Sequence, residues 1–371
     1  MSSSIVGIDI GTAQLRAVEV RNPGKTRPLV LRYHEVPLPV GAVIGGEVLE
    51  PHTVAAALKT LWSSGGFRSR QVVLGMGSQR VLARDLSVPK MSLARIRQSL
   101  SFEVQDLLPV PVADALLDFY PISESTTEHG PTVHGLLIAA VKAAVVANVS
   151  AVRLAGLTTI DVDLIPFAVS RLLVTRPGID GVVAVIDLGA STTSVVVARQ
   201  GVPQFVRIIP TGGDDVTRAV AAGLKTDVGT ADLLKRRVGL LARAAADARP
   251  GSSRSTVPFD GVIAGGSGPI DTVGADIIAE VMNDQLGSVL NTLNYYTNTR
   301  PSDPVTAIVL SGGGAQMPGL REAVSKLTRL RVSAGEPLST VALASAVDAE
   351  GLRQSGAAYT VALGLALGRA A

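Results

Sequence analysis

Short runs of apolar residues separated by polar turns dominate the first 80 positions of the chain. Apolar runs of about four to eight residues predict buried strands, whereas apolar residues at every third or fourth position predict amphipathic helices. The order of these patterns predicts three strands, a helix and a fourth strand. The strands are residues 5–10, 15–20, 29–36 and 71–75, and the helix is capped by Thr53 and ends at Gly65-Gly66.

The next stretch, up to residue 164, has a different pattern that predicts a compact α+β unit. An apolar helical face begins after Ser92 and continues to Leu108, where Pro109 ends the helix. The polar residues 123–132 predict a loop. The other elements are strands at 81–88, 116–122, 136–141 and 158–164 and a helix at 143–154.

The remainder of the chain returns to buried strands and long helices. A tight turn at Gln200-Gly201 predicts a hairpin, and small, charged and proline-bearing residues at 242–260 predict a surface excursion. The closing helix, residues 357–369, carries almost no charge, so we expect it to pack against a sheet. Further helices are predicted from Pro166, after Thr211, at 224–239, at 271–297 and after Pro318, and a buried strand at 305–310.

The first hairpin, residues 7–13, carries the first sign of chemistry. Gly11 lets the backbone turn, which directs free N–H groups into one small space suited to an anion. The lone carboxylate of Asp9 is costly to bury unless it serves a cation or a water. These parts suit a phosphate with a bound metal ion, although a plain hairpin with a capping aspartate would have the same sequence.

The same pattern returns at residues 184–198, because a shift of 178 positions aligns Asp9 with Asp187 and Gly11 with Gly189. A repeat of this length suggests two related halves, each with its own phosphate loop. Two such loops facing each other would clamp a polyphosphate, with one carboxylate from each directed toward a shared Mg²⁺. The alternative is a coincidence of two buried hairpins.

A third glycine-rich stretch, Ser311-Gly312-Gly313-Gly314-Ala315, follows a buried strand and precedes a helix. This arrangement lets a flat ligand or a phosphate approach backbone N–H groups. Residues 262–268 have a similar composition, but they precede the long helix instead of following a strand, so we interpret them as a linker.

Composition narrows the function classes. The 371 residues are 47% hydrophobic, enough for two domains with large cores. Aromatic residues are only 3%, so stacking surfaces for single-stranded nucleic acid are not expected. The 34 basic and 31 acidic residues balance to a net charge of +3, which gives no reason to expect nucleic acid as a partner.

Features that the sequence lacks narrow the class of protein further. There is no cysteine, which excludes disulfides and thiolate chemistry, and the four histidines show no ligand spacing. No apolar run follows a basic N-terminus, and no window holds the roughly 18 uncharged apolar residues of a membrane span. We therefore expect a soluble cytoplasmic protein without direct membrane insertion.

Three motifs in this order resemble the nucleotide loops of the actin, Hsp70 and sugar-kinase superfamily: residues 9–12, 187–191 and 311–315. Within it, the chain is most similar to the PilM family of type IV pilus assembly proteins. Residues 102–109 with Asp114, Leu117 and Asp118, together with 209–218 and 293–296, carry this resemblance. The division protein FtsA shares the inserted subdomain.

The resemblance implies an α/β fold of duplicated actin-like (ribonuclease H-like) domains with an inserted α+β subdomain of the PilM/FtsA type. The implied first half is 1–80, completed by 165–183 and 345–371; the inserted partner-binding subdomain is 81–164; the second half is 184–220 and 285–344; and a small subdomain at 221–284 caps the nucleotide.

The resemblance also implies roles for single residues. Asp9 and Asp187 would hold Mg²⁺ through waters. Asp232 would bond the ribose of ATP, with Lys235 near the ribose and base, although these two would also suit an ordinary ion pair on a helix surface. The other implied positions are Gly11, Thr12, Ala13, Gln14 and Arg16 in the first loop, Gly189, Ala190, Ser191 and Thr192 in the second, Gly213 close to the nucleotide, and Gly312, Gly313, Gly314 and Gln316 around the adenine.

Three of these positions depart from the family pattern. Ala13 and Gln14 stand where the family usually has serines, and Arg16 stands where it usually has a lysine. No glutamate or histidine lies beside either phosphate loop to orient a water, so the catalytic residue is unknown and we expect at most slow ATP hydrolysis.

The family's partner is the short cytoplasmic tail of the inner-membrane protein PilN, which recruits the protein to the cytoplasmic face of that membrane. Strand 81–88 and helix 93–108 would supply the walls of the docking groove, with Arg80, Arg84, Arg95 and Arg97 as candidate contacts. Other pilus assembly partners and self-association stay open. The alternatives are an FtsA-like filament-forming division protein and a small-molecule kinase of the sugar-kinase type.

Overall fold

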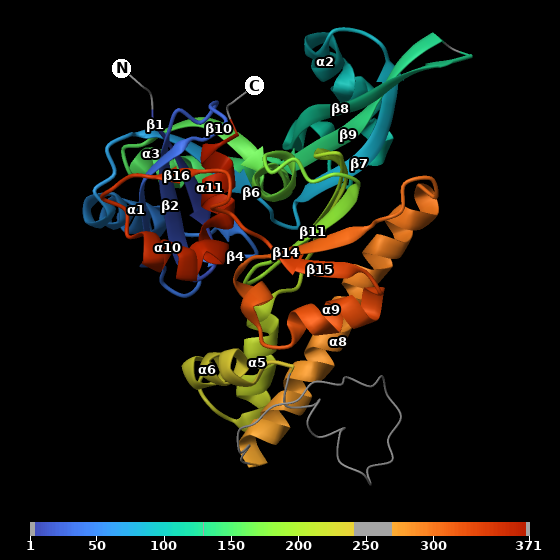
Figure 1. Cartoon of the computed structure of the whole chain (residues 1–371). Helices are drawn as coiled ribbons and strands as arrows, with labels where there is room; N and C mark the ends of the chain where they lie inside the picture. The colour runs from blue at the N-terminus through green and yellow to red at the C-terminus, as the bar shows by residue number, and fades with distance from the viewer. Residues whose placement is uncertain (1–3, 129, 241–268, 369–371) are drawn as a thin grey trace.

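Two β-sheets with matching strand order organise the protein, whose computed structural model describes residues 4–128, 130–240 and 269–368 (Figure 1). Each sheet is built on an antiparallel hairpin with a third antiparallel strand on one side and two parallel strands on the other. The predicted duplication is therefore confirmed. The first sheet runs β10 (Thr158–Leu164), β6 (Gln71–Met76), β1 (Ser4–Ile10), β2 (Gln14–Arg21), β3 (Leu29–Pro37), β16 (Ala342–Leu343); the second runs β15 (Arg331–Ala334), β14 (Ala307–Ser311), β11 (Val182–Leu188), β12 (Thr193–Arg199), β13 (Val202–Ile209).

Helices cover the first sheet, and the closest approach is made by α11 (Thr360–Ala366), all of whose residues are buried. A Cβ atom at Gly7 of β1 would lie 1.9 Å from the Ala362 carbonyl oxygen, so only glycine allows this contact. The expected packing of the uncharged closing helix against a sheet is confirmed. The other elements of this half are α1 (Pro51–Gly65), α3 (Lys142–Leu154), α4 (Ile165–Ser170), α10 (Ala349–Ser355) and the short pair β4 (Val43–Ile44) and β5 (Glu47–Val48).

Helix α1 corrects one expectation. It begins at Pro51 rather than at Thr53, with Glu50 as the N-cap residue, because proline fits the first helical position without losing a hydrogen bond. The hydroxyl of Thr53 instead donates to the Glu50 carboxylate at 2.8 Å. The predicted end is confirmed, since Gly66 caps the helix in the left-handed conformation.

The inserted α+β unit contains a three-stranded sheet ordered β7 (Val81–Pro89), β9 (Gly130–Val141), β8 (Ala115–Thr127), with α2 (Leu93–Glu103) packed on it. The predicted loop at 123–132 is wrong for the described residues, because β8 and β9 pair from Thr127 and Gly130 inward. Backbone hydrogen bonds hold this extension although its side chains are polar. Helix α2 also ends earlier than predicted, at Glu103, followed by a 3₁₀ turn at Gln105–Leu107.

The second half carries a separate layer of helices below its sheet (Figure 1). It consists of α5 (Gly213–Leu224), α6 (Val228–Val238) and the long α8 (Pro269–Thr299), while α9 (Leu320–Thr328) lies beside β15. The predicted surface excursion at 242–260 and the glycine-rich stretch at 262–268 lie outside the described residues.

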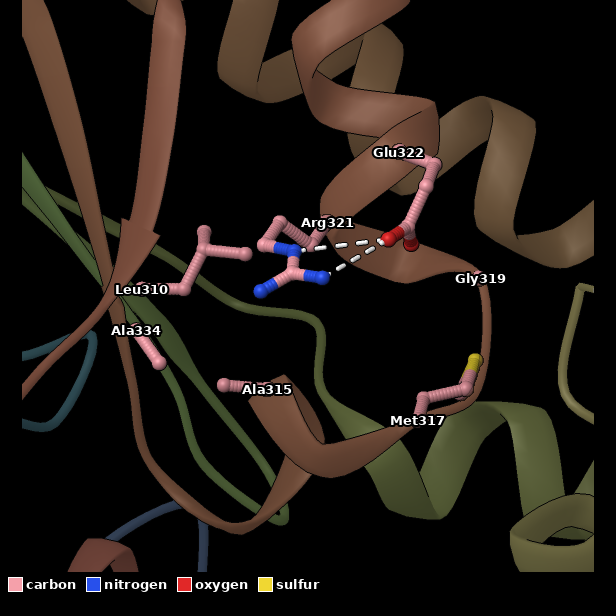
Figure 2. Close-up of a pocket in the computed structure, with 7 residues that line it drawn as sticks. All are labelled: Leu310, Ala315, Met317, Gly319, Arg321, Glu322 and Ala334. Atoms are coloured by element: carbon pink, nitrogen blue, oxygen red, sulfur yellow. Dashed lines mark hydrogen bonds and ion pairs between the residues drawn. The ribbon is translucent and has the colours of Figure 1, made fainter.

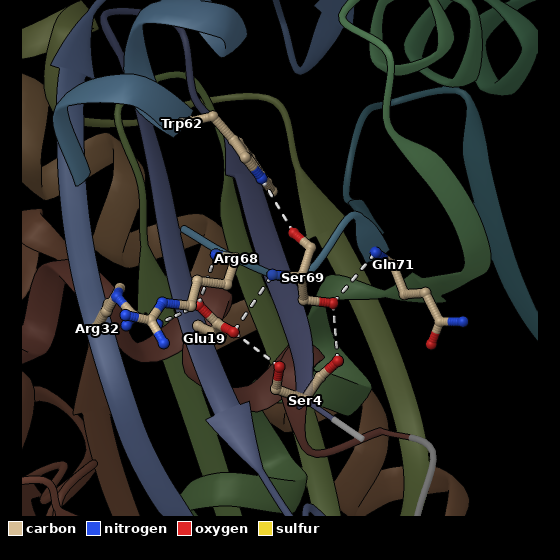
Figure 3. A network of polar contacts seen from close by, with 7 residues as sticks. All are labelled: Ser4, Glu19, Arg32, Trp62, Arg68, Ser69 and Gln71. Atoms are coloured by element: carbon tan, nitrogen blue, oxygen red, sulfur yellow. Dashed lines mark hydrogen bonds and ion pairs between the residues drawn. The ribbon is translucent and has the colours of Figure 1, made fainter. Parts of the chain in front are cut away.

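A buried carboxylate fastens the far end of the first sheet, away from the hairpin turn (Figure 3). Glu19 of β2 is only 1% exposed, and it accepts hydrogen bonds from Ser4 Oγ at 2.7 Å and Arg32 at 2.9 Å. The backbone N–H groups of Arg68 and Ser69 also point at it, at 3.2 and 3.4 Å. With this many partners the charge is compensated, and it ties the segment before β6 to β2.

Candidate functional site

The two predicted phosphate loops meet. Thr12 Oγ1, after β1, donates to Ser191 Oγ, after β11, at 3.1 Å across a separation of 179 residues. Each turn is closed in the same way, from Gly11 N to Gln14 O at 3.1 Å and from Gly189 N to Thr192 O at 2.9 Å. The repeat seen in the sequence therefore brings two equivalent turns face to face.

Charged side chains form a row beside the first loop. Asp9, Arg16 and Glu35 are directly paired across β1, β2 and β3, so their side chains project from the same face of the sheet. Arg16 Nε donates to Glu35 at 2.8 Å, and its guanidinium also bonds the Gln14 side chain. Burial raises the pKa of the Asp9 carboxyl, and the Arg16 charge partly offsets that rise.

Asp187 is the more deeply buried of the two loop carboxylates, at 7% exposed. Its Oδ1 and the neighbouring Ser311 Oγ are buried atoms without a hydrogen-bond partner of standard geometry. Burial raises the pKa of Asp187 to about 6, the nearby Ser311 hydroxyl counteracts this, and the Asp9 charge adds to it. In contrast to the carboxylate of Glu19, Oδ1 of Asp187 has no standard hydrogen bond among the described residues.

The third loop closes over Asp187. Gly312 has φ +84°, and a Cβ atom there would lie 2.4 Å from the Leu188 carbonyl oxygen and 3.0 Å from Asp187 Oδ1. A side chain would therefore clash with the second loop. Gly314 is also pressed against Leu188, whereas Gly313 and Gln316 are exposed. The strand register explains the contact, since Asp187 of β11 pairs with Ser311 of β14.

The start of α5 braces the second loop from another side. The N–H groups of Gly213 and Asp214 donate to the carbonyl oxygens of Gly189 at 3.0 Å and Ala190 at 2.8 Å. Burial raises the pKa of Asp214, and the nearby cations Lys235 and Arg218 partly offset it. The second loop is thus held by α5 and by the third loop together.

Lys235 of α6 also lies at the start of α5, beside the second loop. Its ammonium donates to Gly213 O at 3.1 Å and to Thr217 Oγ1 at 2.7 Å, and it pairs with Asp232 at 2.8 Å. Burial acts to raise the pKa of Asp232, but the bonds and charges of Lys235 and Arg236 outweigh it, so the pKa is lowered. The two predicted ribose residues therefore form an ion pair beside the loop residue Gly213.

Three residues at the site were given no individual role by the sequence, although Ser311 begins the third predicted loop. Glu35 holds Arg16, Ser311 lies opposite Asp187, and Gln285 of α8 is buried and donates from Nε2 to Gly212 O at 2.9 Å. Gln285 carried a signal, because it interrupts the largely apolar face of a long helix. The other two depend on strand register, which the sequence does not display.

A cavity of about 260 Å³ lies beside the third loop (Figure 2). Arg321 and Glu322, which form an ion pair at 3.1 Å, stand on one side of it. Ala315 of the third loop lines this cavity, but none of the residues with a predicted nucleotide contact does, and we assign no ligand to it. Its lining is Leu310, Ala315, Met317, Gly319, Arg321, Glu322 and Ala334.

The two loop carboxylates suit a Mg²⁺ ion that is bound through waters better than an ion that is bound by protein side chains alone. In the described part of the chain, no three His, Asp or Glu side chains group to hold a metal by themselves. Mg²⁺ keeps several waters and usually takes only one or two carboxylates together with phosphate oxygens. The unpartnered Oδ1 of Asp187 is the observation that suits such an ion.

The inserted subdomain meets the first half along a seam at the start of β7. Arg80 pairs there with Glu47 of β5 at 3.1 Å, and on the first-half side of the seam Val48 N donates to Asn148 Oδ1 of α3 at 3.1 Å. Of the other predicted arginine contacts, Arg97 pairs with Asp118. Within the described ranges, Arg84 and Arg95 make no ion pair, and both are exposed.

None of the described helices combines the length and the apolar character that crossing a lipid bilayer requires.

Comparison with known sequences gives two family matches. The model of the family described as type IV pilus assembly protein PilM matches residues 7–245, more than half of the chain. The model of the cell division protein FtsA matches residues 184–360. The FtsA of Neisseria meningitidis is 29% identical over 240 residues, 63% of this chain and 56% of that protein, so the match spans about half of the relative's length.

Comparison with solved structures gives a match over the whole chain. A chain of the PilM-PilN type IV pilus biogenesis complex aligns with a TM-score of 0.81 and 26% identity, covering 100% of both chains. MreB 5 of Spiroplasma citri bound to AMPPNP aligns with a TM-score of 0.52 at 12% identity, covering 98% of this chain and 95% of that one. The second match supports the actin-like fold alone.

Proposed function

Because the chain belongs to the family of the type IV pilus assembly protein PilM, we propose that it is an ATP-binding scaffold of pilus assembly that holds a membrane partner. The observation that carries the proposal is the full-length alignment with a chain of the PilM-PilN complex. That alignment includes the inserted subdomain, which would bind the partner.

We propose that the meeting point of the loops binds the phosphates of ATP. Thr12 and Ser191 come from equivalent turns and already touch, so both hydroxyls and the neighbouring N–H groups would face one polyphosphate. The proposal has support from fold analogy, since MreB 5 of Spiroplasma citri was solved with AMPPNP. Lys235 and Asp232 would lie beside the ribose, and Gly312, Gly313 and Gly314 beside the adenine.

Asp9 and Asp187 would hold Mg²⁺ through waters, and the bound ion would neutralise phosphate charge. Asp187 gains most, because no cation among the described residues offsets its buried charge. For hydrolysis, a side chain would have to orient a water. The hydroxyls and carboxylates beside the phosphates are already engaged or reserved for the ion, so we propose at most slow turnover.

The partner would be the cytoplasmic tail of a PilN-like inner-membrane protein, which would recruit the chain to the inner membrane. We propose that the tail docks at the seam between the inserted subdomain and the first half, next to the Arg80–Glu47 pair. Exposed apolar side chains border this seam, with Ile44 at 57%, Leu49 at 56% and Val146 at 54% exposure. They would bury the apolar residues of an extended peptide.

A pull-down tests the proposal. The purified chain, wild type or Asp187→Ala, is incubated with detergent-solubilised membranes with and without Mg-ATP. Recovery of a single-span PilN-like protein, altered by nucleotide in the wild type only, is the expected result. Asp187→Ala should weaken Mg²⁺-dependent nucleotide binding about 10- to 100-fold, whereas Asp284→Ala, on the exposed face of α8, should not. No recovered partner, with ATP consumption stimulated by a metabolite, would indicate a small-molecule kinase instead.

A second candidate has specific support. The FtsA family model matches residues 184–360, and curated relatives of the chain are FtsA proteins. An FtsA-like role would require filaments that form with Mg-ATP. Sedimentation of the full chain with and without Mg-ATP separates the two functions, since the scaffold should stay in the supernatant.

A further inference from the structure

Strand β7 of the inserted subdomain is tied to the second half by an ion pair, and Arg80, the residue just before β7, is tied to Glu47 of the first half. Arg80, just before β7, pairs with Glu47 of the first half at 3.1 Å. Asp85, within β7, pairs with Arg300 of the second half at 2.6 Å. Strand β7 also packs along β13, the edge strand of the second sheet. A movement of one half relative to the other therefore acts on β7 directly.

Arg300 is anchored to the second half by contacts that do not involve Asp85. Its guanidinium carbon lies 5.3 Å from the centre of the Tyr296 ring, and Nη2 donates to Gln204 O at 3.3 Å. Tyr296 itself is fully buried, and Arg300 N donates to Tyr296 O at 2.9 Å. These contacts fix the position of Arg300, so its positive charge faces the inserted subdomain and pairs there with Asp85.

Helix α8 connects this point to the loops. Gln285, in the middle of α8, donates to Gly212 O beside the second loop, and α8 packs against α5 and α6. The fifteen helical steps from Gln285 to Arg300, the residue directly after α8, would span about 22 Å at the rise of an α-helix. A helix of this length moves as a rigid element, so a displacement of the loops is carried to Arg300.

We propose that Arg300 is a positioning residue that couples nucleotide occupancy to the pose of the inserted subdomain through Asp85. This inference rests on the proposed function. An ion pair whose geometry differs between two arrangements of the halves contributes different free energy to each. A nucleotide that favours one arrangement then changes the affinity of the partner site at the start of β7, and the reverse holds equally.

The test measures the dissociation constant of a synthetic peptide, the N-terminal cytoplasmic tail of the PilN-like protein of the same genome, by fluorescence anisotropy. Each full-length variant is measured with and without Mg-AMPPNP, and the ratio of the two constants reports the coupling. Asp85→Asn and Arg300→Gln should each move the ratio toward 1 by about two- to fivefold. The double variant should match either single variant, because all three break one pair.

The matched control is Arg199→Gln. Arg199 pairs with Asp303 at 3.3 Å, close to Arg300 but entirely within the second half. Its removal costs a similar exposed ion pair and should leave the ratio unchanged. The exchanged pair Asp85→Arg with Arg300→Asp should restore part of the ratio, which a general loss of stability would not do.

The outcomes separate this inference from the function on which it rests. A wild-type ratio that persists in Asp85→Asn overturns the coupling role of Arg300 and leaves the scaffold function intact. A wild-type ratio of 1 contradicts nucleotide-dependent partner binding and the coupling role together. Failure of the wild type to bind the peptide at all contradicts the proposed partner.

Discussion

The turns after β1 and after β11 have equivalent backbones and different charges. Gly11 N to Gln14 O closes the first, and Gly189 N to Thr192 O closes the second. Beside the first, the paired row is Asp9, Arg16 and Glu35. Beside the second, the equivalent positions are Asp187, Ser194 and Ile208.

Because of this difference, the two copies of the repeated motif differ in how strongly each would gain from an added cation. The Asp9 charge is partly compensated by the cation of Arg16, whereas a buried oxygen of Asp187 has no hydrogen-bond partner among the described residues. An added cation would therefore gain most beside Asp187. Duplication supplied the same turn twice, and the neighbouring strands gave each turn its own electrostatics.

The largest expected effect comes from substituting Gly7, a position at which the two central strands, β1 and β11, differ. Gly7 of β1 corresponds to Val185 of β11, which carries a buried side chain. Gly7→Ala places a Cβ against the backbone of α11, so we expect a loss of about 4 kcal/mol or more in the free energy of unfolding, or no soluble protein. Urea titration of both variants measures this free energy. Gly313→Ala, where a Cβ meets nothing within 4 Å, should change the free energy of unfolding by less than about 0.5 kcal/mol.

The next effect tests the uncompensated charge of Asp187. Its pKa is about 6 in the folded state against 3.8 when unperturbed, so the folded state binds the proton more tightly than the unfolded state does. The charged group therefore lowers stability above pH 6, and this penalty disappears as pH falls from about 6 to 4. Asp187→Asn should stabilise the ligand-free protein by about 2–3 kcal/mol at pH 7.

Urea unfolding of wild type and Asp187→Asn across pH 4–7.5 checks this expectation. The two curves should converge at the acid end, and Mg²⁺ with nucleotide should stabilise the wild type only. A variant that is less stable than wild type at pH 7 would mean that the Asp187 charge is compensated within the protein.

Arg16→Ser replaces the arginine beside Asp9 with serine, the residue that stands at the equivalent position, Ser194, beside Asp187. The change removes the Glu35 ion pair and the charge that lowers the pKa of Asp9, so we expect a loss of about 0.5–1 kcal/mol at pH 7. Because burial raises the pKa of Asp9, the loss should shrink as the pH falls and Asp9 takes up its proton. Arg21→Ser, on the same strand at the other end, should cost less; equal losses at pH 7 would remove the special role of the charged row.

The smallest effect measures the contact between the two turns. Thr12→Ala and Ser191→Ala each remove one side of the 3.1 Å hydrogen bond, and a double-mutant cycle of the free energy of unfolding should give a coupling of about 0.5–1 kcal/mol. Nucleotide that bridges both hydroxyls should increase this coupling. Strictly additive effects with and without nucleotide would show that the turns act independently.

Much of the fold followed from local patterns. The strand at 158–164 was predicted with its observed ends, and Ser92 and Gly66 cap helices as expected, because burial and capping leave a clear sequence signal. The hairpin between Ala115 and Val141 was only partly predicted. Its outer residues are polar and exposed, and strand pairing there depends on backbone hydrogen bonds that any side chain permits.

The sequence by itself determined the two aspartate-glycine turns, their spacing of 178 residues and the third glycine stretch, since these depend on residue type and order. Only the tertiary structure decided that Thr12 touches Ser191, that Glu35 holds Arg16 and that Arg300 reaches Asp85. These contacts join residues from 19 to 215 positions apart. They exist because strand register and helix packing bring distant side chains together, and neither property is written in any local stretch of the chain.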